Sequence, residues 1–173
     1  MALQQELDHD YYADSLIRDV LTSVRSIAVL GASPNPSRPS NGVTGFLISR
    51  GYKVFAVNPG HAGKIIAGAA TFADLNDLPE PVDMVDVFRA PQHLPSIIQS
   101  VLHMPVLPKV IWTQLNVRDD HAARQAESAG LTVIQDRCPA IEIPRLGLSA
   151  QFQSCNPGAA RKTILCIRKI VSE

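Results

Sequence analysis

The chain has 173 residues, of which 46% are hydrophobic and 18% charged, and its formal net charge is zero. This length suits one domain with a substantial core, and the neutral balance gives no reason to expect nucleic acid as a partner. No apolar run reaches the roughly 18 residues of a membrane span, and residues 1–14 lack the basic and apolar regions of a signal peptide. Three cysteines without a CxxC pair favour reduced thiols. We therefore expect a single domain over residues 1–173, located in the cytoplasm, with no membrane partner.

Five apolar or β-branched runs have the length of strands, and segments with helical spacing follow them. Nearly continuous apolar strands that alternate with helices predict a parallel sheet buried on both faces. Right-handed crossovers then give an α/β fold, a Rossmann-like doubly wound parallel sheet of about five strands with flanking helices. The expected strands are Ser26–Leu30, Lys53–Val57, Met84–Phe88, Lys109–Trp112 and Thr132–Gln135.

The expected helices have apolar stripes at helical spacing. One lies within an N-terminal segment, residues 1–25, and another within a C-terminal extension, residues 146–173, where residues 159–171 show the pattern. Apolar positions on this last helix would allow a homodimer without requiring one. The three helices expected between strands are Asn41–Gly51, Leu94–Leu102 and Asp119–Gly130.

The first expected strand ends at Gly31, where an acid-free segment begins. No Asp or Glu occurs from Gly31 to Ala73, although the chain as a whole has 16 acidic residues. Ligands of doubly wound sheets bind beyond the carboxyl ends of the strands, and a glycine followed by a helix N-terminus favours phosphate there. Arg38 could pair with a phosphate through two hydrogen bonds. The pattern predicts a phosphate-rich small molecule as the ligand.

A nicotinamide dinucleotide fits this segment poorly. The loop after Gly31 lacks the G-x-G-x-x-G pattern, and the second strand is followed by Asn58-Pro59-Gly60-His61, without the carboxylate that holds the ribose of NAD. NADP does not need that carboxylate, so a protein that binds NADP or another nucleotide stays open as an alternative.

Six segments in register resemble one known family, the small stand-alone CoA-binding proteins. That family is similar to the CoA-binding domain of succinyl-CoA synthetase α-subunits, and the resemblance covers roughly residues 26–146. The segments are Val29-Leu30-Gly31-Ala32-Ser33 with its Arg-x-Ser loop, Gly51-Tyr52-Lys53-Val54 leading to Val57-Asn58-Pro59, Val85-Asp86-Val87-Phe88-Arg89, Ile111-Trp112-Thr113-Gln114, Ala129-Gly130-Leu131 and Asp136-Arg137-Cys138.

The resemblance implies a CoA site along the strand ends. The residues that it implies fall into four groups: Gly31, Ala32, Ser33, Arg38 and Ser40 around the phosphates; Asn58 and Pro59 after the second strand, with His61 or Lys64 near the 3′-phosphate; Phe88 and Arg89 along the adenine or pantetheine path; and Trp112, Thr113 and Gln114 as the rest of that wall.

Some of these residues have a structural alternative. Trp112 could equally be a core residue, and Arg89 could pair with Asp86 instead of the ligand. Asn116 stands where the family often has glycine, and asparagine can adopt the same left-handed conformation. Cys138 is expected either as a buried, inert thiol or as a group that forms a mixed disulfide with CoA.

These observations predict a protein that binds coenzyme A or a short acyl-CoA. They reveal no catalytic constellation, because Glu142 is a lone carboxylate beyond the fifth strand. The histidines show no metal-ligand spacing. The alternatives are an acyl-CoA-dependent enzyme, a partner of a separately encoded ligase domain, and an NADP- or nucleotide-binding protein.

Overall fold

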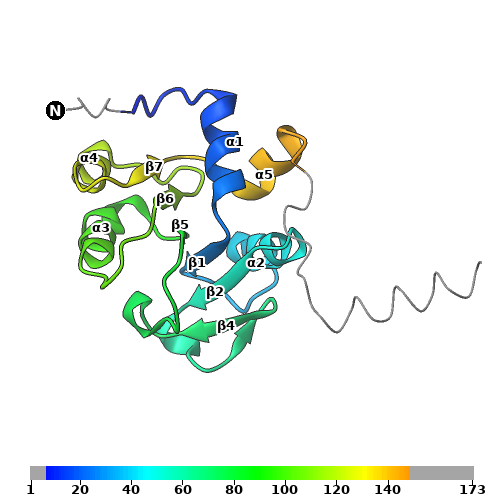
Figure 1. Ribbon diagram of the computed structural model, residues 1–173. Coiled ribbons are helices and arrows are strands. Elements are labelled where there is room, and N and C mark those ends of the chain that lie inside the picture. The colour runs from blue at the N-terminus through cyan, green and yellow to red at the C-terminus, as the bar shows by residue number, and fades with distance from the viewer. Residues whose placement is uncertain (1–6, 149–173) are drawn as a thin grey trace, which may run out of the picture.

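The computed structural model describes residues 7–148, which form a seven-stranded sheet with helices on both faces (Figure 1). The strand order is β3-β4-β2-β1-β5-β6-β7, and every neighbouring pair is parallel except β3 and β4. The strands are β1 (Ser26–Leu30), β2 (Lys53–Val57), β3 (Ile65–Ile66), β4 (Ala69–Phe72), β5 (Met84–Val87), β6 (Val110–Thr113) and β7 (Thr132–Ile134). The predicted α/β fold is confirmed.

Helices form one layer on each side of the sheet. On one side α5 (Pro139–Arg145) contacts both α1 (Asp14–Ser23) and α2 (Pro39–Ser49), and on the other side α3 (Leu94–Leu102) packs against α4 (Asp120–Ser128). Short 3-10 helices span Pro59–His61, Leu75–Asp77 and Pro91–His93. No helix within residues 7–148 is long and apolar enough to cross a membrane.

Both faces of the sheet are buried, which explains the apolar composition of its strands. Along β1, Ile27 and Val29 point into the core beneath α1, α2 and α5, whereas Ala28 points into the core beneath α3 and α4. Because successive side chains of a strand point to opposite faces, a central strand buries the side chains of both faces, and most of its residues are apolar.

Two strands and one helix were not predicted from the sequence. β3 and β4 are short, and β4 buries the small residues Ala69 and Thr71, which give no strong strand pattern. α5 contains Pro139 and Pro144, which read as breakers, but Pro139 occupies the first helical turn, where no intrahelical N–H bond is needed. The predicted C-terminal helix lies outside the described residues, so the homodimer that its apolar positions would allow stays a prediction.

Asp83 joins the amino-terminal ends of three central strands. Its Oδ2 accepts hydrogen bonds from the backbone N–H groups of Arg25 (2.8 Å) and Ser26 (3.2 Å), and its Oδ1 forms an ion pair with Lys109 at 2.8 Å. Burial opposes ionisation of this carboxyl, but Lys109 and the two amides hold its pKa below the usual range. Asp83 therefore acts as a charged acceptor that aligns β1, β5 and β6.

Replacing Asp83 with Ala should lower the free energy of unfolding by about 1–3 kcal/mol, because two backbone N–H groups lose a charged acceptor. Urea unfolding at pH 7 measures the change. The matched control is Asp19→Ala on the exposed side of α1, which should change stability by no more than about 0.5 kcal/mol. Equal effects of the two substitutions would contradict the role assigned to Asp83.

Candidate functional site at the carboxyl ends of β1 and β5

The winding of the sheet reverses between β1 and β5. The chain leaves β1 through α2 on one face, and it leaves β5 through α3 on the opposite face (Figure 1). The two connections diverge at neighbouring strand ends, and ligands of doubly wound sheets bind in the crevice that opens there. Residues 31–38 and 88–90 border this crevice.

Gly31 ends β1 at a point where a side chain does not fit. Its φ is +87°, in the left-handed region, and an added Cβ would overlap the backbone carbonyl oxygen of Phe88. The Gly31 N–H donates to the Val57 carbonyl oxygen at 2.9 Å, and the Phe88 N–H donates to the Leu30 carbonyl oxygen at 2.8 Å. Gly31 thereby lets the ends of β2, β1 and β5 approach one another closely.

The loop after Gly31 is fixed by its own polar side chains. The Ser33 N–H donates to Ser40 Oγ at 3.1 Å, and Asn41 Nδ2 donates to the Ser33 carbonyl oxygen at 2.9 Å. α2 then begins with Pro39, and no side chain caps its N-terminus. Pro39 has no N–H group and the Asn41 N–H donates to the Arg38 carbonyl oxygen at 3.0 Å, so the positive end of the helix dipole is the main feature that this end offers to an anion.

Asn58 ties the end of β2 to the same loop. Its Nδ2 donates to the Ala32 carbonyl oxygen at 2.7 Å, and its Oδ1 accepts a hydrogen bond from the Gly60 N–H at 3.0 Å. This position follows the second strand, where NAD sites have a carboxylate that binds ribose. Here the side chain is an amide that supports the loop, which agrees with the sequence argument against NAD.

The larger of two cavities at this edge has a volume of about 750 Å³, within the range of small-molecule sites. Its lining combines two arginines with no carboxylate. Residues after β1, β5 and β6 and from the start of α5 contribute: Gly31, Ser33, Arg38, Pro39, Ser40, Phe88, Arg89, Ala90, Gln114, Leu115, Asn116, Val117, Cys138 and Ile141.

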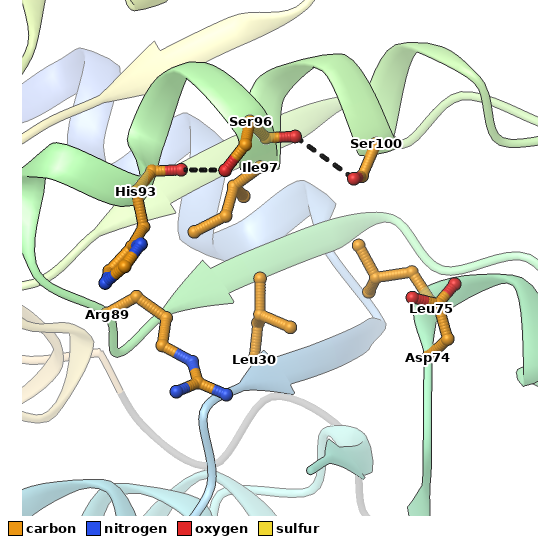
Figure 2. Close-up of a pocket in the computed structure, with 8 residues that line it drawn as sticks. All are labelled: Leu30, Asp74, Leu75, Arg89, His93, Ser96, Ile97 and Ser100. Atoms are coloured by element: carbon orange, nitrogen blue, oxygen red, sulfur yellow. Dashed lines mark hydrogen bonds between the residues drawn. The ribbon is translucent and has the colours of Figure 1, made fainter. Parts of the chain in front are cut away.

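The smaller cavity, of about 230 Å³, lies beside the first turns of α3 and shares Arg89 with the larger one. Figure 2 shows the side chains of Arg89 and His93 on one side of Leu30 and those of Asp74 and Leu75 on the other. Ser96, Ile97 and Ser100 complete the lining, and both serine hydroxyls donate to backbone carbonyl oxygens, of His93 at 2.9 Å and of Ser96 at 3.0 Å.

The structure brings together about half of the residues predicted for the ligand. Ala32 is buried behind the first loop, and Pro59, His61 and Lys64 follow β2 at the same edge of the sheet without lining either cavity. The predicted residues that line the larger cavity are Gly31, Ser33, Arg38, Ser40, Phe88, Arg89 and Gln114.

Trp112 and Thr113 lie in the core beneath the site. The Trp112 side chain is fully buried, and its Nε1 donates to the Arg137 carbonyl oxygen at 2.7 Å. Thr113 Oγ1 donates to the Val117 carbonyl oxygen. In this structure both side chains hold the backbone of neighbouring loops and do not line either cavity.

Several lining residues were missed by the sequence analysis. Leu115, Val117 and Ile141 line the larger cavity, and His93 and the serines of α3 line the smaller one. Leu115 follows Gln114 directly at a strand end, and this adjacency could have indicated it. Ile141 had no comparable signal, because α5 itself was not predicted.

Asp86 is a fully buried carboxyl on β5 behind the larger cavity. Gln114 Nε2 donates to its Oδ1 at 2.8 Å, whereas Oδ2 has no hydrogen-bond partner within residues 7–148. Burial raises the pKa of Asp86 to about 7, although the Gln114 hydrogen bond opposes this shift. The partner of Asp86 is therefore a cavity-lining amide, not the Arg89 suggested as an alternative from the sequence.

Two left-handed residues shape the loops after β6 and β7. Asn116 has φ +62°, the left-handed conformation that the sequence analysis considered possible for it, and Asp136 has φ +54°. The Asn116 N–H donates to Asp136 Oδ1 at 2.7 Å, which joins the two loops. Arg137, which follows Asp136, donates to the Asp136 carbonyl oxygen at 2.8 Å and lies over the Tyr12 ring.

The Cys138 thiol lines the larger cavity but is buried and free. Burial raises its pKa, so that the neutral thiol is favoured over the reactive thiolate. The described residues contain no group of three His, Cys, Asp or Glu side chains that could hold a metal ion. The site thus offers cationic and apolar surfaces, and not an activated nucleophile.

Comparison with known proteins identifies the family. A model described as a CoA binding domain matches residues 25–144. The chain belongs to the CoA-binding-domain family. It is 30% identical over 122 residues to the uncharacterized protein YneT of Bacillus subtilis (strain 168), which is 70% of this chain and 87% of YneT. Membership in the CoA-binding-domain family supports CoA as a ligand in general.

Solved structures share the fold of this CoA-binding-domain protein. A hypothetical protein from Pyrococcus horikoshii OT3 has a TM-score of 0.73 at 32% identity, with 82% of this chain and 97% of that chain covered. A protein from Thermus thermophilus has a TM-score of 0.68 at 37% identity, with 78% and 99% covered. These likenesses agree with the Rossmann-like arrangement predicted from the sequence.

Replacing Gly31 with Ala should lower the free energy of unfolding by at least about 2 kcal/mol, because the new Cβ needs a left-handed backbone and overlaps Phe88. Thermal and urea unfolding measure this loss. Gly42→Ala in α2 is the matched control: no atom lies within 4 Å of its added Cβ, so it should stabilise by about 0.5–1 kcal/mol. If both variants were as stable as the wild type, the close approach at Gly31 would be refuted.

Asp86 should make the protein less stable as the pH rises from about 4 to about 7. The pKa of the Asp86 carboxyl is 3.8 in the unfolded chain and about 7 in the folded protein. Between these two pH values only the folded protein keeps the proton. This difference in pKa corresponds to a fall of up to about 4 kcal/mol in the free energy of unfolding. Urea unfolding between pH 5 and pH 8 should show the fall in the wild type and a flatter profile for Asp86→Asn.

Asp14→Asn is the control for this profile. The Asp14 pKa is lowered, mainly by its hydrogen bond to Arg145, so its contribution is lost only in the acidic range, as the pH falls through that lowered value. Between pH 5 and pH 8 this variant should keep the wild-type slope. A wild-type slope in Asp86→Asn would show that Asp86 is not the titrating group.

Proposed function

We propose that the protein binds coenzyme A at the carboxyl ends of β1 and β5, with the pyrophosphate at the N-terminus of α2. The observation that carries the proposal is the larger cavity, in which Arg38, Arg89 and the uncapped first turn of α2 meet without a carboxylate. A helix N-terminus and guanidinium groups both bind phosphate oxygens.

The two cavities suit the two ends of CoA. CoA is a long molecule with its pyrophosphate between the nucleoside and the pantetheine arm, and Arg89 lines both cavities. The smaller cavity offers Leu30, Leu75 and Ile97 to the faces of an adenine ring and serine hydroxyls to its edge. We assign the nucleoside to the smaller cavity and the pantetheine arm to the larger one.

The 3′-phosphate is assigned to the segment after β2. His61 and Lys64 belong to the acid-free part of the chain, and His61 Nδ1 is buried without a hydrogen-bond partner within residues 7–148. Lys64 is exposed. A phosphate beside them would supply an acceptor for the imidazole N–H and a counter-charge for the ammonium group.

A binding role fits this site better than a catalytic one. The lining of the larger cavity has no histidine and no carboxylate, and its one thiol favours the protonated form. We further propose, as parts of the same hypothesis, that residues 1–173 form a single domain and that the protein acts in the cytoplasm.

Isothermal titration with CoA should give saturable binding, and Arg38→Ala should weaken it by about 10- to 100-fold because a charge-assisted hydrogen bond is lost. Arg18→Ala, on the exposed face of α1, is the matched control and should leave affinity unchanged. Lys64→Ala should weaken CoA but leave 3′-dephospho-CoA unaffected. No binding at millimolar CoA, or displacement of CoA by equimolar NADP, would contradict the proposal.

A further inference from the structure

We propose that the larger cavity also contains an acyl subsite, and that the ligand is an acyl-CoA with an uncharged hydrocarbon chain. This inference rests on the proposed function, because the CoA portion must occupy the same cavity. It follows from the part of the lining that comes from the loops after β5 and β6 and from α5, where five apolar side chains gather.

The lining changes character across the sheet. Next to β1 it is polar and positively charged, with Ser33, Arg38 and Ser40. Past β5 and β6 the lining contains Arg89, Gln114 and Asn116 together with an apolar group: Phe88, Leu115, Val117, Cys138 and Ile141. A ligand whose phosphates lie against α2 therefore directs its other end toward a hydrocarbon surface, which suits the thioester end of an acyl-CoA.

Two large apolar side chains of this surface are exposed to solvent. Leu115 is 49% exposed and Ile141 is 50% exposed, and both line the larger cavity from different elements. Single exposed apolar residues are normal on a protein surface, but a pair that converges on one cavity marks a binding surface. An acyl chain lying between them would remove both from water.

The turn that presents Leu115 is fixed before any ligand binds. The Val117 N–H donates to the Gln114 carbonyl oxygen at 3.0 Å, and the Gln114 side chain is held by Asp86. Asn116, in its left-handed conformation, is held by Asp136. Leu115 is flanked by anchored residues on both sides, so little ordering is needed when a chain packs on it.

The apolar side of the cavity has no partner for a charged acyl group. Its five apolar residues, the neutral Cys138 thiol among them, offer no cation, and the two arginines of the cavity, Arg38 and Arg89, are assigned to the phosphates. A carboxylate at the end of the acyl chain would lose water without gaining an ion pair. The subsite should therefore distinguish butyryl-CoA from succinyl-CoA, which have acyl chains of the same carbon number.

Titration of the full chain with CoA and with acetyl-, butyryl-, hexanoyl-, octanoyl- and succinyl-CoA tests the subsite. Each added pair of methylenes should tighten the dissociation constant by up to about fifteenfold until the cavity is filled. Butyryl-CoA should bind at least about tenfold more tightly than succinyl-CoA.

Leu115→Ser and Ile141→Ser should each weaken octanoyl-CoA by about tenfold more than they weaken CoA itself. Their matched control is Ile65→Ser, an apolar residue that is 68% exposed and lies on β3 away from the cavity. That variant should bind octanoyl-CoA as the wild type does. Retained CoA binding shows that each variant is folded.

The outcomes separate the acyl subsite from the proposed function. Equal dissociation constants for CoA and all acyl-CoAs, or succinyl-CoA binding as tightly as butyryl-CoA, would overturn the subsite and leave CoA binding intact. Octanoyl-CoA affinity that is unchanged in Leu115→Ser and Ile141→Ser would also overturn it. No binding of any of these ligands would instead overturn the proposed function itself.

Discussion

The site depends on the contact between Gly31 and the backbone of Phe88. A Cβ at residue 31 would overlap the Phe88 carbonyl, so glycine lets the ends of β1 and β5 come close together. This close approach lies at the point where the winding of the sheet reverses. This contact sets the position of the first loop, the N-terminus of α2 and Arg89. A side chain at residue 31 would separate the two strand ends whose loops form the larger cavity.

Many polar side chains at this edge form hydrogen bonds that hold the loops of the site in place without a ligand. Ser40 and Asn58 hold the first loop, and Asp136 holds the turn at Asn116. Such internal hydrogen bonds lower the conformational entropy lost on binding. The burial of the Asp86 carboxyl is energetically unfavourable, because one of its oxygens has no hydrogen-bond partner within residues 7–148 and its pKa is raised.

The larger cavity has a cationic part and an apolar part, and the two suit different parts of a long ligand. Positive charge gathers near α2 because no carboxylate occurs from Gly31 to Ala73, and the apolar side is formed by elements that come much later in the chain. Family membership supports CoA in general, whereas the gradient within the cavity supports an acylated form of it.

The sequence alone determined five of the seven strands in the described residues and the helices between them, because apolar periodicity is a local property. The tertiary structure decided which residues line the larger cavity. Trp112 and Gln114 are two positions apart after the same strand pattern, yet one lies in the core and the other lines the cavity. Leu115 and Ile141 line the same cavity although they are far apart in the sequence, and the packing of α5 against α2 that positions Ile141 is a long-range contact with no local signal. Which side chains are buried, and which line one cavity, depends on packing between segments that are distant in the sequence. The periodicity of a single segment does not contain this information.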